Sequence, residues 1–356
     1  MIEGVVVIDN QGRVILINQN AREMFDLPNG PSFHGASILE ISRHPDMKQL
    51  TGEVLSCDCS AECFSKEIAL NERWFRVNAV SLRTGTETTL GYIMVFHDVT
   101  QLKRLETVRA DFVANVSHEL RTPLSAIKGY VETLLHNPPK IPETAHQFLE
   151  VVDRHSERLG RLIDDLLAVS DLESGKAQLA REPVEVDHLL GRVLEIFRDQ
   201  AKRKGISLSH EMDRDLPPIS GDPDRLQQLL INLVDNALKY TPSKGRVQVT
   251  AQLSGALNGM ESPMVEIVVS DSGCGIPEKD IPRLTERFYR VDKARSRELG
   301  GTGLGLAIVK HIVQAHAGYI KIESQLQKGT TVRIYLPSAT RTPSLASSRP
   351  GAGARG

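Results

Sequence analysis

No apolar run in this sequence of 356 residues is long enough to cross a membrane. The longest apolar stretches, such as residues 5–8, fall far short of the roughly 20 residues that a spanning helix needs. The N-terminus also lacks the basic segment, apolar core and cleavage site of a secretory signal. We therefore expect a cytoplasmic chain that makes no membrane contact as given, and that is membrane-tethered only if an N-terminal anchor lies outside this sequence.

Strong net charge, abundant cysteine and abundant aromatic residues are missing as well. The 43 Lys+Arg and 45 Asp+Glu leave a net charge of −2, which argues against nucleic acid as a partner. Four cysteines in so long a chain argue against a disulfide scaffold and favour a reducing compartment. Aromatic residues make up 4%, so the cores must be built from aliphatic side chains, which suits amphipathic helices.

An ordinary globular mixture is present, with 40% hydrophobic and 25% charged residues, which excludes disorder of the whole chain. The length suits about two or three domains. The first 98 residues contain short strands separated by turn signals, and these strands are expected at residues 4–9, 13–18, 74–80 and 91–97. We expect residues 1–98 to form a small α+β domain dominated by an antiparallel sheet, with the first two strands in a hairpin.

From Val99 onward, apolar residues recur every three or four positions, which is typical of a long amphipathic helix. Pro138 and Pro139 break this helix, and a second helical run follows until Gly175. The two runs predict an antiparallel hairpin over residues 99–178. Each helix has more apolar surface than one antiparallel partner covers, so we expect a dimer in which two hairpins form a four-helix bundle.

Residues 183–337 alternate between helices and strands. Asp222 before Pro223 is a helix N-cap followed by a first-turn proline. Helices are expected from 187, 222 and 304, and strands near 206 and at 246–253, 265–269, 319–323 and 331–336. The tail, residues 338–356, is rich in Ser, Pro, Gly and Ala and is predicted to be disordered.

One histidine stands in a context that favours chemistry. His118 lies two residues from Val116 and from Leu120, so on a helix it points away from the apolar seam. Glu119 can accept the proton from one ring nitrogen and leave the other nucleophilic. Pro123 removes the amide that would bond the carbonyl of Glu119, so we expect the helix to bend there. For His118 alone, a solvated surface histidine is the alternative interpretation.

A polar helix face follows in the last third of the chain. Asn232, Asn236 and Lys239 are spaced by four and three residues, so their side chains share one face. Such a face can hold hydrated Mg²⁺ together with triphosphate oxygens, because Mg²⁺ keeps several waters and needs few protein ligands. An ordinary solvated helix face is the alternative for this string alone.

Two glycine-containing strings complete the set. Asp271 follows a predicted strand and precedes Gly273 and Gly275, so its carboxylate can accept the exocyclic amine of adenine while the glycines let the backbone approach the base. The glycine-rich string 300–306 opens an apolar helix, and its amides form an anion site for phosphates. The polar segment between them, residues 286–298, is expected to be a lid over ATP. The first string alone also fits a simple turn.

Taken in this order, the strings resemble the phospho-acceptor box and the nucleotide-binding boxes of sensor histidine kinases of two-component systems. The resemblance implies ATP and Mg²⁺ as cofactors and autophosphorylation on His118, with Glu119 as base or orienting group and Asn236 as metal ligand. It implies that Thr122 positions a water for hydrolysis of the regulator's phosphate. The other implied nucleotide contacts are Asn232, Lys239, Tyr240, Asp271, Gly273, Gly275, Arg287, Arg290, Gly301, Thr302, Gly303, Leu304 and Gly305.

The resemblance also implies an α+β multidomain fold: a PAS-like sensory domain (1–98), a dimerising phospho-acceptor hairpin (99–178), and an α/β sandwich ATPase domain of the histidine kinase and gyrase type (183–337). The implied partners are a second copy of the chain, as a homodimer, and a response regulator with a receiver domain. The acceptor box is most similar to that of the phosphate-regulon sensor group. The alternatives are a serine kinase of the same ATPase fold and a catalytically silent PAS scaffold.

The cysteines add little to this set. Cys57, Cys59 and Cys63 lie close together, which fits either a metal or redox site or ordinary loop cysteines. No fourth ligand stands at a suitable spacing, so loop cysteines are favoured. Cys274 lies within the predicted adenine string and is expected to be a packing residue.

Overall fold

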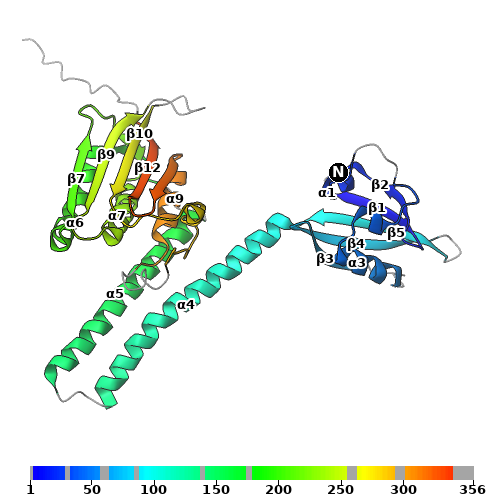
Figure 1. The fold of residues 1–356 in the computed structure, drawn as a ribbon, viewed down its shortest axis with the longest axis horizontal. Coiled ribbons are helices and arrows are strands. Elements are labelled where there is room, and N and C mark those ends of the chain that lie inside the picture. Colours follow the sequence, from blue (N-terminus) through cyan, green and yellow to red (C-terminus); the bar gives the residue numbers. More distant parts are fainter. Residues whose placement is uncertain are drawn as a thin grey trace, which may run out of the picture. The chain divides into compact units, whose positions relative to one another are not determined.

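The computed structural model describes residues 3–28, 33–56, 64–83, 88–136, 141–173, 179–254, 263–292 and 301–339. The chain divides into two compact units, residues 1–114 and 115–356, and each is considered by itself (Figure 1). No helix in these described ranges is long and apolar enough to span a bilayer.

The first unit is built around a five-stranded sheet with the strand order β2-β1-β5-β4-β3, in which every neighbouring pair is antiparallel. Its elements are β1 (Gly4–Asp9), β2 (Val14–Ile17), α1 (Gln19–Met24), α2 (Ile38–Ile41), α3 (Pro45–Ser56), β3 (Phe64–Leu70), β4 (Arg73–Arg83) and β5 (Thr89–Asp98). The four predicted strands and the β1–β2 hairpin are confirmed. The edge strand β3 and the three helices add to them.

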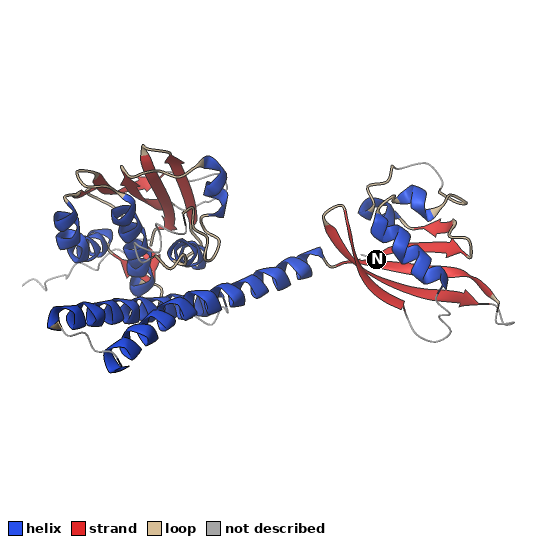
Figure 2. Ribbon diagram, turned by 60° about the horizontal axis from the view of Figure 1, so that its bottom comes forward, coloured by secondary structure: helices blue, strands red, loops and turns tan. Residues whose placement is uncertain are grey.

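Two long helices form the predicted antiparallel hairpin. They are α4 (Thr100–His136) and α5 (Pro142–Glu173). The rings of Tyr130 and Phe148 lie 5.1 Å apart near the closed end, and Glu119 meets Arg158 farther along, so the two helices run side by side in opposite directions (Figures 1 and 2). Large apolar side chains of the hairpin stay exposed in the single chain, among them Leu135, which is 71% exposed.

The second unit contains a five-stranded sheet with the order β11-β12-β10-β9-β7, in which β7 and β9 are parallel and the other pairs antiparallel. Its elements beyond the hairpin are β6 (Glu182–Val184), α6 (Val186–Lys204), β7 (Ser207–Met212), β8 (Ile219–Gly221), α7 (Pro223–Tyr240), β9 (Arg246–Ser254), β10 (Met264–Asp271), η1 (Glu278–Arg283), α9 (Gly305–Ala315), β11 (Tyr319–Gln325) and β12 (Gly329–Pro337). The predicted alternation of helices and strands is confirmed, and the short β6–β8 pair is added.

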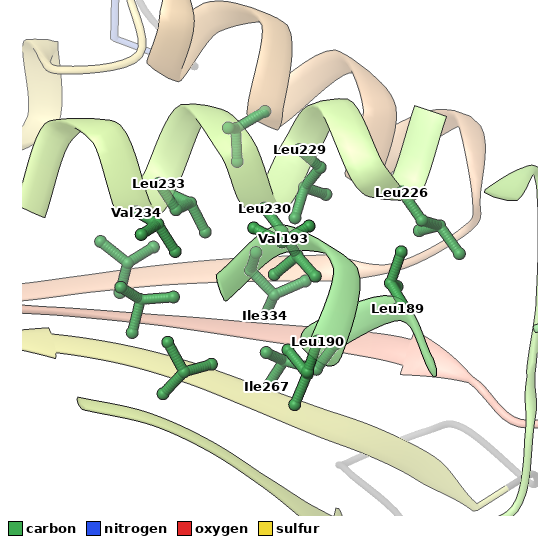
Figure 3. Packing of buried hydrophobic residues seen from close by; sticks show 14 of the residues in the cluster. Leu189, Leu190, Val193, Leu226, Leu229, Leu230, Leu233, Val234, Ile267 and Ile334 are labelled. Atoms are coloured by element: carbon green, nitrogen blue, oxygen red, sulfur yellow. The ribbon is translucent and has the colours of Figure 1, made fainter. Parts of the chain in front are cut away.

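The helices α6, α7 and α9 share one core with the inward residues of this sheet. Figure 3 shows Leu230 of α7 and Leu190 of α6 packed near Ile334 and Ile267 of the strands, with Leu226 beside Leu189 farther along the same layer. Most alternate residues of the strands are polar, although Met264 and Val268 of β10 are not, and some bond to one another on the other face: Glu266 accepts from Tyr335 and Arg333. This one-sided alternation places the helices on one face only and produces the α/β sandwich.

Local signals fix the helix that carries the asparagines. The Asp222 carboxylate accepts from the amides of Asp224 and Arg225, and Pro223 occupies the first turn, as predicted. The buried ring of His316, which follows α9, accepts from the Asp222 amide at 2.9 Å through Nε2. Its Nδ1 lies 2.8 Å from the carbonyl oxygen of Ile312. His316 therefore joins the start of α7 to the end of α9.

The last turns of α5 belong to the same core. Val169 is buried in the cluster formed by α6, α7, α9 and the sheet, and Leu166 and Leu172 pack against that cluster. Hydrophobic contact therefore fixes this part of the hairpin against the sandwich.

Candidate functional site

The predicted acceptor lies in the middle of α4 and is exposed, as the helical spacing predicts. One turn later, the hydroxyl of Thr122 donates to the carbonyl oxygen of His118 at 3.1 Å. Pro123 lies inside the helix, and the bend expected there stays a prediction. In the described part of the chain, no hydrogen bond joins the His118 ring to Glu119, so the ring is open to a reaction partner from solvent.

Glu119 is held by two arginines. Its Oε2 accepts from Nη2 of Arg158 on α5 and from Nη2 of Arg290, each at 3.2 Å. The side chains are 13% exposed for Glu119 and 5% for Arg290. Charge-assisted hydrogen bonds of this kind are stronger than neutral ones, so the carboxylate beside the acceptor is firmly oriented. Sequence reasoning missed Arg158, because it lies 39 residues away on the other helix.

The asparagine face of α7 meets the glycine string. A Cβ atom on Gly305, the first residue of α9, would lie 2.8 Å from Oδ1 of Asn232 and 3.7 Å from Nδ2 of Asn236. The absence of that Cβ leaves a cradle in which both amides face the start of α9. Asn232 also donates from Nδ2 to the carbonyl oxygen of Gln228 at 3.0 Å. Two strings about 70 residues apart thus lie side by side in the fold, and their roles in nucleotide binding stay a prediction.

Lys239 and Tyr240 continue the α7 face. Nζ of Lys239 lies 2.6 Å from Oδ2 of Asp235, a partner that sequence reasoning missed although its spacing of four residues on a helix is a usable signal. The backbone oxygen of Tyr240 lies 2.7 Å from the position of a Cβ on Gly273, so the end of α7 touches the predicted adenine string. The Cys274 amide approaches the same oxygen at 3.4 Å.

Asp271 is fixed at the end of β10. Its Oδ1 accepts from the amides of Gly273 at 2.7 Å and Thr330 at 3.3 Å. Burial raises the pKa of this carboxyl group, and the two amides oppose that rise by stabilising the ionised form. Gly275 has a φ of +66°, and its hydrogen faces the backbone of Gln325 so closely that a side chain would not fit. The string is therefore a rigid turn that presents one carboxylate.

The described part of the glycine loop packs against the segment that carries the predicted arginines. Gly303 has a φ of +76°, its carbonyl oxygen accepts from the Phe288 amide at 2.8 Å, and a Cβ would lie 3.0 Å from Nε of Arg290. Leu304 is fully buried and its amide donates to the Thr302 hydroxyl at 3.3 Å. Gly301 precedes this turn. The loop is thus held in place by its neighbours.

The remaining predicted residues lie at the rim. Arg287 is close enough to His311 on α9 that its charge contributes to lowering the pKa of that imidazole, after the larger effect of burial. Thr302 donates to Oδ2 of Asp165 on α5 at 2.7 Å. Residues 293–300, which include the second part of the expected lid, and Cys57, Cys59 and Cys63 lie outside the described residues.

The donor set fits a magnesium ion carried by a triphosphate. In the described ranges no group of three or more His, Cys, Asp or Glu residues is placed to hold a metal ion. Mg²⁺ bound to phosphates keeps several waters and needs only one or two protein oxygens. Oδ1 of Asn232 lies beside the Gly305 cradle, and Asn236 places its amide group next to it with Nδ2 toward Gly305, so the two side chains carry the one or two oxygens that such an ion needs.

A hollow of about 380 Å³ lies near these residues but is a different feature. It is lined by Arg246, Ser270, Asp271, Lys328 and other residues at the ends of β9–β12. Asp271 therefore borders it, whereas neither the asparagine face nor the glycine loop contributes to it. The candidate nucleotide site is accordingly described by its converging side chains rather than by this hollow.

Comparison with protein families finds three matches along the chain. Residues 1–107 match a family described as PAS fold, and residues 108–175 match the His Kinase A (phospho-acceptor) domain. Residues 221–340 match the histidine kinase-, DNA gyrase B-, and HSP90-like ATPase. The order agrees with the order of the strings in the sequence.

Among curated proteins, sensor histidine kinase WalK of Bacillus subtilis is 35% identical over 340 residues, which cover 95% of this chain and 54% of that protein. Sensor protein kinase WalK of Staphylococcus aureus is 33% identical over 95% of this chain and 79% of its own length. The chain spans about half the length of most of the curated relatives it matches.

Solved structures share the architecture. The crystal structure of histidine kinase ThkA in complex with response regulator protein TrrA matches with a TM-score of 0.52 and 22% identity over 94% of this chain and 96% of that chain. Histidine kinase AdeS of Acinetobacter baumannii matches with a TM-score of 0.50 and 24% identity over 63% of this chain and 98% of its own. These likenesses support the fold.

Proposed function

The chain belongs to the sensor histidine kinase family, and from this premise we propose that it phosphorylates itself on His118 with ATP and then passes the phosphoryl group to an aspartate of a response regulator with a receiver domain. One observation carries the proposal: an exposed histidine on α4 lies in the same unit as a site in which Asn232, Asn236 and the glycine loop converge.

In the proposed reaction, a ring nitrogen of His118 attacks the γ-phosphorus of ATP. A new N–P bond forms, the bond between the γ-phosphorus and the bridging oxygen breaks, and ADP leaves with that oxygen. The ring proton passes to Glu119 or to water. Because phosphoryl transfer depends on positioning and on neutralisation of charge, the main task of the chain is to hold the triphosphate in line with the ring.

The predicted nucleotide residues divide this task. Asp271 would accept the adenine amine, while Lys239, Asn232 and the amides of the loop that includes Gly303 would hold the phosphates. Asn236 would hold Mg²⁺, which neutralises charge on the phosphate oxygens when bound. The close approach of α7 and α9 at Gly305 supports this division, because it brings the side chains of Asn232 and Asn236 to the residue that follows the glycine loop.

The contacts of Glu119 favour the orienting role over the role of base. Its carboxylate is already bonded to Arg158 and Arg290, so accepting the ring proton would require one of these bonds to change. Arg290, Arg287 and Thr302 remain proposed phosphate contacts that would be reached when ATP is bound. Tyr240, Gly273, Gly275, Gly301 and Leu304 remain proposed nucleotide contacts.

We propose that two copies associate through their hairpins. Support comes from the exposed apolar side chains of the hairpin, including Leu124, Leu135 and Leu167, which are 58%, 71% and 58% exposed in the single chain. A four-helix bundle would cover them. The proposed boundaries stay at 1–98, 99–178 and 183–337.

Thr122 would position a water that hydrolyses the regulator's phosphate. In the structure its hydroxyl donates to the carbonyl oxygen of His118, so a rotation about one bond would make it available. Thr122→Ala should leave autophosphorylation intact and slow the loss of phosphate from the regulator. Equal rates of loss for the variant and the parent would contradict this role.

Two finer proposals rest on the sequence alone. Placement in the phosphate-regulon sensor group, with a phosphate-responsive signal, stays a prediction, since the relatives described above carry the WalK name. The cytoplasmic location also stays a prediction. A serine kinase is disfavoured by the match to a phospho-acceptor domain, and a silent scaffold by the converging nucleotide residues.

Incubation with γ-labelled ATP and Mg²⁺ tests the main proposal. The label should be stable in base, labile in acid and absent from His118→Gln. His210→Gln is the matched control and should keep the label, because His210 is exposed on the edge strand β7 and takes no part in the candidate site. An acid-stable label would indicate a serine kinase, and no label would indicate a scaffold.

A further inference from the structure

Two carboxylates of the hairpin contact side chains that are proposed to bind phosphate. Glu119 on α4 accepts from Arg290 at 3.2 Å, and Asp165 on α5 accepts from the hydroxyl of Thr302 at 2.7 Å. The two contacts come from different helices and reach different parts of the nucleotide site. In each contact, a carboxylate oxygen accepts a hydrogen bond from a group that is proposed to donate to a phosphate oxygen of ATP.

Asp165 is held in this position by the packing around it. Val169, one turn farther along α5, is fully buried in the core of the sandwich, and Leu166 packs against the same core. Burial raises the pKa of the Asp165 carboxyl group, and the Thr302 hydroxyl and the charge of Lys239 act in the opposite direction. The carboxylate therefore lies within electrostatic reach of Lys239, a second proposed phosphate contact.

A carboxylate at this place competes with ATP for simple chemical reasons. The Thr302 hydroxyl has one proton and can donate to Asp165 or to a phosphate oxygen, but not fully to both. The ammonium of Lys239 attracts either anion, and two anions close together in a partly buried site repel each other.

We propose that Asp165 is an internal competitor of the ATP phosphates, so that the full chain binds ATP more weakly than its nucleotide residues alone would allow. This inference rests on the proposed function, since it needs Thr302 and Lys239 to bind phosphate. Asp165 does not touch the reacting atoms and acts through these two residues as a positioning residue.

Competition of this kind works in both directions. If Asp165 weakens ATP binding, ATP weakens the contact between α5 and the glycine loop by the same factor, because the coupling between two binding events is reciprocal. The arrival of the triphosphate would also draw Arg290 away from Glu119, the neighbour of the acceptor. Nucleotide binding thus loosens the sandwich from its own hairpin and changes the surroundings of His118 in one step.

Titration of the full chain with the non-hydrolysable analogue AMP-PNP and Mg²⁺ tests the proposal. Asp165→Asn removes the charge and should bind AMP-PNP about fivefold or more tightly than the parent. Asp164→Asn is the matched control, because it removes the same charge from the adjacent, exposed position of α5 and should leave the affinity unchanged. Adenosine, which has no phosphate, should bind all three proteins equally.

The outcomes separate this inference from the proposed function. Unchanged or weaker AMP-PNP binding by Asp165→Asn would overturn the competition. It would also be overturned if Asp164→Asn gained as much AMP-PNP affinity as Asp165→Asn, or if Asp165→Asn gained as much affinity for adenosine as for AMP-PNP. Asp165→Ser is a second variant, and it should show the same gain. Equal adenosine affinity reports that the site is folded in each variant. If none of the proteins, the parent included, bound AMP-PNP, the proposed nucleotide site itself would be overturned. If AMP-PNP bound but His118 carried no label after incubation with ATP, the proposed kinase activity would fail and the competition would stand.

Discussion

The acceptor region and the nucleotide region are constructed in opposite ways. His118 is exposed on a helix whose neighbouring apolar side chains are largely exposed in the single chain, whereas Asp271 is held by two backbone amides at the end of a buried strand. A site proposed to bind one ligand, ATP, gains from rigid preorganisation. In the proposed reaction, the histidine meets first ATP and then a regulator's aspartate, so it has to remain open. The core of the sandwich is therefore completed within one chain, with the last turns of α5 included, whereas most of the hairpin leaves large apolar side chains exposed in the single chain.

The largest expected difference between the two regions concerns stability. Leu230→Ala removes a fully buried side chain from the core of the sandwich and should lower the free energy of unfolding by about 2–5 kcal/mol. Leu135→Ala, at a 71% exposed position of α4, should change it by about 0.5 kcal/mol or less in the monomer but weaken the dimer. Denaturant unfolding at low protein concentration measures the first effect, and sedimentation measures the second. Similar losses in the monomer would contradict the comparison.

Replacing a glycine by alanine tests the same difference between the nucleotide region and the hairpin. Gly305→Ala would place a Cβ 2.8 Å from Oδ1 of Asn232 and should weaken AMP-PNP binding by roughly tenfold, equivalent to ~1.4 kcal/mol. Gly160→Ala on α5 is the matched control, because nothing lies within 4 Å of the added atom. It should leave nucleotide affinity unchanged and stabilise the helix by about 0.5–1 kcal/mol. Equal affinities in both variants would show that the cradle is not part of the site.

The smallest effect concerns His316, the buried histidine of the sandwich. Burial lowers the pKa of His316, so the folded sandwich binds fewer protons than the unfolded chain. The stability it contributes is present above the unfolded pKa of about 6.5 and is lost as the pH falls from there toward the folded value, by at most ~1.4 kcal/mol per pH unit. Unfolding measured from pH 7.5 to 5.5 should show this decline in the parent.

The test variant is His316→Gln. It should flatten the pH dependence of unfolding, because it removes the titrating group between Asp222 and Ile312. An unchanged profile in His316→Gln would contradict this role of the buried ring.

Prediction from the sequence succeeded where a local pattern carries the information. The period of α4 and α5, the Asp222–Pro223 start of α7 and the spacing of the asparagines are all read along one element. The edge strand β3 was missed, because Lys66 and Glu67 lie within its seven residues and obscure the apolar alternation. The three-residue strands β6 and β8 are too short for any periodicity to show.

By itself, the sequence determined the order of the three regions, the exposure of His118 and the residue types that can bind a triphosphate. Each of these depends on residues only a few positions apart in the chain. Only the tertiary structure decided which side chains hold one another. Arg158 and Arg290 reach Glu119 from 39 and 171 residues away, and Thr302 reaches Asp165 from 137 residues away. Such pairs arise when apolar packing, as at Val169, brings distant elements together. Packing between elements far apart in sequence leaves no periodic mark on either of them.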